Sequence, residues 1–147
     1  MTTTAPRVDG RVIGLAHYAG RAALESVLTR YGLGFQQQIT LRLVAVADGP
    51  VGHDRLVGEV VAALKTDETA VRGVVDELIA AKLLQSETSD VRITDAGREL
   101  YDRIATETGA ISARIYADIP AADLATAGRV LTLVTERADA ELAAVKA

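Results

Sequence analysis

The stretch from His53 to Thr94 constrains the fold more than any other, because its pattern of apolar residues changes repeatedly within a short span. Residues 53–64 carry apolar side chains at helical spacing, namely Leu56, Val57, Val60, Val61 and Leu64. Beyond Lys65-Thr66 a second helical stripe follows, made of Val71, Val74, Val75, Leu78 and Ile79. Two β-compatible runs, 83–86 and 91–94, then flank a turn-forming tetrad, Glu87-Thr88-Ser89-Asp90. The pattern predicts helix, tight turn, helix and short hairpin, in that order.

That order is typical of a winged helix-turn-helix, in which the second helix enters the major groove of DNA. The second helix is expected to start at an N-cap Thr66, with Asp67 and Glu68 in its first turn, where carboxylates favour the helix dipole. Its apolar stripe leaves one set of residues facing outward, namely Glu68, Thr69, Arg72, Gly73 and Asp76. We therefore expect a protein that reads nucleic acid rather than a catalyst.

Helices are predicted on both sides of this unit, so the fold class is mainly α with a small β-hairpin. Residues 1–10 are polar and predict a disordered arm with no assigned role. Helices follow over 11–30 and about 34–47, and a long helix follows Gly97. A last helix is expected to carry Pro120 at its first position. It bears an apolar stripe made of Leu124, Leu131, Val134, Ala138 and Leu142. Ala-rich stripes on the first and last helices indicate a dimer interface.

Composition excludes several classes of protein. Hydrophobic residues make up 49% of the chain but aromatic residues only 3%, which favours closely packed helices with Ala, Val, Leu and Ile in the core. With no Cys and two separated His, we expect no metal site, and we expect no cofactor. No apolar run approaches the roughly 20 residues of a membrane span, and the chain start lacks a basic-then-apolar segment, so a cytoplasmic protein is expected. We find no phosphate loop and no nucleophile-base set that would suggest an enzyme.

From residue 11 onward the sequence resembles the MarR family of winged-helix transcriptional regulators. The resemblance lies in the order and spacing of several segments: Phe35 to Leu43, Leu64 through Leu84 with its Val71, Val74-Val75-Asp76 and Leu78 pattern, Ile93-Thr94-Asp95-Ala96-Gly97 with Leu100, and Ile119-Pro120 through Leu133. It implies a single domain over 11–147, with a DNA-binding winged-helix lobe at 34–97 and dimerisation helices at 11–33 and 98–147. It further implies a homodimeric, repressor-like regulator that binds an inverted repeat in double-stranded DNA and is released by a small aromatic or acidic ligand.

The chain departs from the family pattern in its charge. The family wing usually carries an Asp-x-Arg-Arg stretch, of which only Arg92 remains, and Gly73 and Glu68 stand where basic and neutral residues are usual. Between residues 53 and 98 six basic residues (Arg55, Lys65, Arg72, Lys82, Arg92, Arg98) face nine acidic ones. Because phosphate neutralisation supplies most non-specific affinity, DNA binding is expected to be weak or to depend on a local cluster of Arg55, Arg72 and Arg92.

The candidate DNA-binding residues are Arg55, Thr66, Thr69, Ala70, Arg72, Gly73 and Arg92. Arg72 could read guanine through a bidentate pair, or it could be held locally by Asp76 or Glu68, and the two roles are compatible. Thr69 could contact DNA through its hydroxyl or serve only as a local cap. Arg92 is expected in the wing, where the alternative is a solvated charge on a strand.

The resemblance to the MarR family also implies an effector pocket, located between the interface helices and the winged lobe. The residues placed there are His17, Tyr18, Arg21, Tyr31, Phe35 and Arg42. An arginine beside aromatic rings suits a carboxylate ligand. Alternatively, Tyr31 and Phe35 pack the helix junction while His17 and Arg21 are surface residues. The rival function is a winged-helix protein that has lost DNA binding and serves as a protein-interaction or ligand-binding module.

Overall fold

The computed structural model describes residues 4–147, which form two compact units, one reaching Ile111 and the other spanning Ser112–Ala147. The first three residues of the predicted arm lie outside the described residues, and residues 4–9 form no helix or strand. Helix α1 (Gly10–Arg30) begins one residue earlier than expected, because the Asp9 carboxylate accepts a hydrogen bond of 2.9 Å from the Val12 amide and caps the helix.

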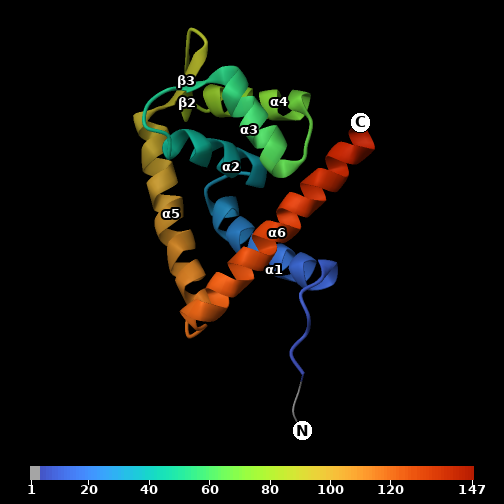
Figure 1. The fold of residues 1–147 in the computed structure, drawn as a ribbon. Helices are drawn as coiled ribbons and strands as arrows, with labels where there is room; N and C mark the ends of the chain where they lie inside the picture. Colours follow the sequence, from blue (N-terminus) through green and yellow to red (C-terminus); the bar gives the residue numbers. More distant parts are fainter. Residues whose placement is uncertain (1–3) are drawn as a thin grey trace. The chain divides into compact units, whose positions relative to one another are not determined.

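Helices α2 (Phe35–Ala45), α3 (His53–Leu64) and α4 (Glu68–Ala80) lie against one another (Figure 1). Their apolar stripes meet in one core. The stripes predicted for α3 and α4 are confirmed in the main, since their central residues are buried, whereas Val61, Leu64 and Ile79 are only half-buried. Leu28 of α1, Leu41 of α2 and Leu84 complete this core. The tight turn predicted between α3 and α4 is present, with Lys65 in the left-handed region at φ 55°.

The N-cap predicted for α4 is wrong by one residue. Asp67, not Thr66, precedes the helix, and its carboxylate accepts a hydrogen bond of 2.8 Å from the Ala70 amide. A carboxylate is an N-cap as good as a hydroxyl, and here it also places a negative charge at the positive end of the helix dipole. The start of α4 is therefore more acidic than a threonine cap would make it.

The predicted hairpin is part of a three-stranded sheet. Strand β1 (Val51–Gly52), which the sequence analysis missed, pairs with β3 (Asp90–Ile93), and β3 pairs with β2 (Leu84–Glu87) in the order β1-β3-β2. Two residues are too few to show an alternating pattern, so β1 had no sequence signal. The turn of the hairpin is shorter than the four residues predicted, because Glu87 and Asp90 belong to the strands and pair with each other.

Helix α5 (Asp95–Tyr116) starts before Gly97 rather than after it. The Thr94 hydroxyl oxygen accepts a hydrogen bond of 3.0 Å from the Gly97 amide and lies 2.7 Å from the Lys82 carbonyl, so it joins the start of the helix to the end of α4. Gly97 is buried there, and a Cβ on it would lie 2.1 Å from the Leu83 carbonyl oxygen. Close packing against the Leu83 carbonyl thus requires a glycine at this position.

The second unit contains helix α6 (Ala121–Lys146), and Pro120 lies just before it with extended backbone (ψ 137°). The expectation that Pro120 occupies the first helical position is wrong by one residue. None of the residues of α6 is buried, and the predicted stripe is 37–41% exposed at Leu124, Leu131, Val134 and Leu142. None of the helices within residues 4–147 combines the length and the apolarity of a membrane span.

Within residues 4–147, one buried acceptor in the core lacks a hydrogen-bond partner. Gln38 of α2 is 6% exposed and its Oε1 has no hydrogen-bond donor, whereas the buried Thr40 hydroxyl donates to the Gln36 carbonyl at 2.8 Å. An unsatisfied buried polar atom costs about 1–3 kcal/mol.

We therefore expect Gln38→Met, which keeps the volume and removes the unpaired oxygen, to raise the free energy of unfolding by about 1 kcal/mol. Thr40→Val is the matched control, because it removes a satisfied group and should lower stability by about 0.5–1 kcal/mol. Urea unfolding followed by circular dichroism measures both. If both variants lowered the free energy of unfolding, Gln38 would have a hydrogen-bond partner in solution.

Candidate nucleic-acid interface

Helix α4 presents an exposed face in which several candidate residues lie. Thr69, Ala70 and Gly73 are exposed, and Arg72 is half-buried beside them. Apart from the neighbouring backbone of the helix itself, no atom of residues 4–147 lies within 4 Å of the position that a Gly73 Cβ would take, so a ligand could approach the helix backbone closely there. Thr66 lies half-buried in the turn before the helix. Thr69, Ala70, Arg72 and Gly73 thus share one surface.

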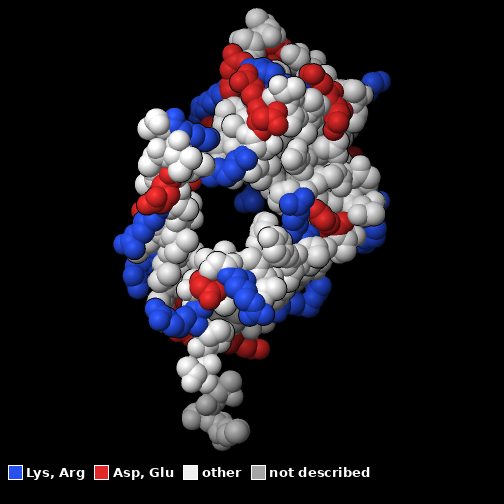
Figure 2. Space-filling model, turned by 90° about the vertical axis from the view of Figure 1, so that its right-hand side faces the viewer, with Lys and Arg blue, Asp and Glu red and all other residues white. Residues whose placement is uncertain are grey.

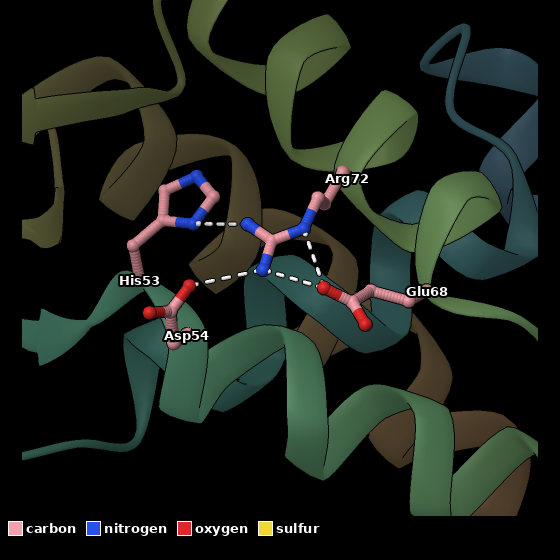
Figure 3. A network of polar contacts seen from close by, with 4 residues as sticks. All are labelled: His53, Asp54, Glu68 and Arg72. Carbon is pink, nitrogen blue, oxygen red and sulfur yellow. Dashed lines mark hydrogen bonds and ion pairs between the residues drawn. The ribbon is translucent and has the colours of Figure 1, made fainter.

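Arg72 lies at the centre of a polar network that joins α4 to the first turn of α3 (Figure 3). Its Nε and Nη2 donate to the Glu68 Oε1 at 2.9 and 2.7 Å, and its Nη2 also donates to the Asp54 carboxylate at 3.0 Å. Its Nη1 lies 3.3 Å from the Nδ1 of His53. The predicted local pair with Glu68 is confirmed, whereas the predicted pair with Asp76 is not formed.

Sequence reasoning missed His53 and Asp54 as partners of Arg72. They lie 19 and 18 residues before it, and only the crossing of α3 and α4 brings them together. The two carboxylates raise the pKa of the Arg72 guanidinium, with the hydrogen bond to Asp54 as the largest cause and that to Glu68 next. Arg72, Asp54 and Glu68 also line a hollow of about 360 Å³ whose remaining walls are Val57, Gly58 and Val61.

The wing carries Arg92 on its exposed side. Its guanidinium donates to Glu87 at 2.6 Å and to Gln85 at 2.8 Å, both on the neighbouring strand β2. Gln85 is the cross-strand partner of Arg92, so the register of the hairpin fixes this contact. Arg92 thus lies in the wing as predicted, and its charge is paired within the wing.

Arg55, the third candidate, is the most exposed of the three arginines, with 78% of its side chain open to solvent. It pairs with Glu59 one turn further along α3, at 3.0 Å. All three candidate arginines therefore have a carboxylate partner within the chain. Figure 2 shows one face of the molecule, on which acidic side chains predominate near the end that carries the wing, with few basic side chains among them.

The candidate ligand residues do not gather in one place. Arg21 lies over the ring of Phe35, 4.1 Å from its centroid, and pairs with Glu25 at 2.7 Å. Arg21, Glu25 and Phe35 help to line a hollow of about 480 Å³, together with Gly34, Gln36, Gln37, Val74 and Glu77. His17 and Tyr18 pack edge to face on the exposed side of α1, and Arg42 is exposed on α2.

Tyr31 lies apart from that hollow and joins the end of α1 to α5. Its hydroxyl donates to the Glu107 carboxylate, which also accepts from Arg30 at 2.7 Å. The hydrogen bond raises the pKa of Tyr31 and, acting on the ionised partner, lowers the pKa of Glu107. This cluster supports the packing interpretation of Tyr31.

The cluster predicts a pH window of stability. The lowered pKa of Glu107 means that its contribution exists above its ordinary pKa of 4.5 and is lost as pH falls through the lower folded value. The raised pKa of Tyr31 means that its contribution exists below 10.0 and is lost as pH rises through the higher folded value. We expect Tyr31→Phe to lower the melting temperature most between these limits and least at either extreme. A pH series of thermal unfolding curves checks this, and a constant difference across the series would contradict it.

Comparison with solved structures identifies the class of fold, whereas no protein-family model and no curated protein sequence matches the chain. The chain is similar to CouR from Rhodococcus jostii RHA1 in complex with p-coumaroyl-CoA (21% identity, 85% of this chain and 89% of that one, TM-score 0.72). It is similar to the reduced form of MarR from E. coli (17%, 88% and 95%, TM-score 0.67). It also resembles the Mycobacterium tuberculosis MarR family protein Rv2887 in complex with p-aminosalicylic acid (20%, 89% and 99%, TM-score 0.66).

The six helices and the small antiparallel sheet that the structure describes between residues 4 and 147 define a winged-helix fold. More particularly, this chain has the fold of the MarR-type winged-helix regulators, which confirms the fold class expected from the sequence.

Proposed function

We propose that this protein is a sequence-specific DNA-binding transcriptional regulator, a repressor that acts as a homodimer on an inverted repeat. One observation carries the proposal: the exposed face of α4 has Arg72 at its centre and an open backbone at Gly73, and the same lobe carries a wing with Arg92. An arginine on a recognition helix can read guanine through a bidentate pair, and a wing arginine can enter the minor groove.

Dimerisation is proposed from the terminal helices. The apolar stripe of α6 is incompletely buried in the single chain, and an amphipathic helix of this kind needs a partner surface to cover it. A two-fold dimer would present two copies of α4 to a palindromic site. Sedimentation at micromolar concentration tests this part directly, and a monomer there would contradict it.

A small aromatic or acidic effector is part of the proposal. Two of the similar structures hold ligands of this kind, p-coumaroyl-CoA in CouR and p-aminosalicylic acid in Rv2887. In this chain Arg21 beside Phe35 offers a cation next to an aromatic face, a pairing that suits a carboxylate on a ring. We propose a binding protein rather than an enzyme, with its place of action in the cytoplasm.

The rival function is a winged-helix module that has lost DNA binding. It is favoured by the pairing of Arg55, Arg72 and Arg92 with carboxylates of the same chain. Selection of bound duplexes from random DNA, repeated at low and moderate salt, separates the two functions. An enriched palindrome supports the regulator and gives the half-site spacing. Binding without enrichment that vanishes as salt rises, or no binding, supports the rival.

A further inference from the structure

Arg72 has no free pair of donors with which to read a base. A guanidinium offers two edges for a bidentate contact, one formed by Nε and Nη2 and one formed by Nη1 and Nη2. Both nitrogens of the first edge donate to Glu68, at 2.9 and 2.7 Å. The second edge faces Asp54, at 3.0 Å from Nη2, and His53, at 3.3 Å from Nη1 (Figure 3). A guanine can therefore be read only if one edge is released.

The two edges differ in how easily they open. Glu68 lies one helical turn before Arg72 on the same helix and accepts hydrogen bonds from two nitrogens of the guanidinium. This contact is therefore local and consists of two hydrogen bonds. Asp54 comes from α3, makes a single contact, and has 90% of its side chain exposed to solvent. The edge that faces Asp54 and His53 is thus the one that a base can take, while Glu68 continues to hold the other edge in place.

We infer that Asp54 is an autoinhibitory residue that competes with guanine for Arg72, while Glu68 positions the same arginine for reading. The inference rests on the proposed function. Both carboxylates also repel DNA phosphates, but only Asp54 occupies the edge that must be vacated. Removal of Asp54 should therefore strengthen specific binding by more than the loss of one negative charge explains, and removal of Glu68 should not.

The test compares Asp54→Asn with Asp76→Asn on the palindrome obtained by selection. Asp76 is exposed on α4, one turn after Arg72, and makes no ion pair with Arg72 in the part of the chain that the structure describes, so its removal measures the effect of charge alone. We expect Asp54→Asn to tighten binding at least about 5-fold more than Asp76→Asn does. Glu68→Gln should tighten binding no more than Asp76→Asn and should weaken the preference for guanine at the contacted base pair.

A double-mutant cycle separates competition from a structural effect. In an Arg72→Ala background the extra gain of Asp54→Asn over Asp76→Asn should vanish, because no guanidinium remains to be released. Thermal unfolding of each variant verifies that the fold is intact. If Asp54→Asn gains no more than Asp76→Asn, or if its gain persists without Arg72, the inference is wrong while the proposed function stands. If neither the wild-type protein nor Asp54→Asn binds any duplex, the proposed function itself fails.

Discussion

Gly97→Ala is expected to destabilise the protein by about 3 kcal/mol, at the upper end of the usual cost of overpacking. The added Cβ would lie 2.1 Å from the Leu83 carbonyl oxygen and 2.9 Å from Ile93 Cγ1, and the backbone oxygen cannot rotate away as a flexible side chain would. The clash falls where α5 meets the start of β2, so relief requires α5 to move away from the sheet and to break the Thr94 contacts.

Gly109→Ala is the matched control, because Gly109 lies in the same helix and its Cβ would meet nothing within 4 Å. The free energy of unfolding of that variant should rise by about 0.5–1 kcal/mol, because alanine has a higher helix propensity than glycine. Denaturant unfolding of the three proteins gives the comparison. A Gly97→Ala protein as stable as the wild type would mean that the close approach of α5 to Leu83 is absent in solution.

Arg72→Ala should reduce affinity for the selected palindrome roughly 5- to 100-fold, the range expected from loss of one bidentate base contact. The loss should fall on one base pair in each half-site, since a base contact specifies whereas a phosphate contact only positions. Competition titrations against duplexes with each base at that pair measure it.

Arg72→Lys and Arg55→Ala serve as controls for charge. The lysine keeps the positive charge but not the planar fork, so Arg72→Lys should also lose the base preference. Arg55→Ala should weaken binding to all sequences alike and reduce the salt dependence by about one phosphate contact. A folded Arg72→Ala protein that retains its preference would show that another residue reads the base.

Local sequence patterns predicted the helices because each apolar stripe is long enough to repeat. Residues 53–64 were placed correctly as a helix, and the stripe from Val71 to Leu78 is buried as expected. Errors gathered at the ends of elements, where one hydrogen bond decides the boundary. Asp67 displaced Thr66 as a cap because both side chains accept hydrogen bonds and the pattern does not choose between neighbours.

Contacts between elements were less predictable than the elements. The pair of Arg72 with Glu68 follows from helical spacing, but the contacts with Asp54 and His53 depend on how α3 crosses α4. The same holds for Gly97, which was expected to precede the long helix and is instead buried inside the first turn of α5. In both cases the outcome depends on the distance between two segments that are far apart in the sequence. Local periodicity carries no information about that distance.

The two-residue strand β1 has a consequence for how the wing behaves. Val51 pairs with Val91, and the His53 amide donates a hydrogen bond of 2.8 Å to the Ser89 carbonyl in the turn of the wing. Backbone hydrogen bonds therefore join the wing to the segment that begins α3 and carries Asp54. A wing held by these backbone hydrogen bonds has little conformational entropy left to lose when it docks. Its turn also contacts His53, which is itself a partner of Arg72.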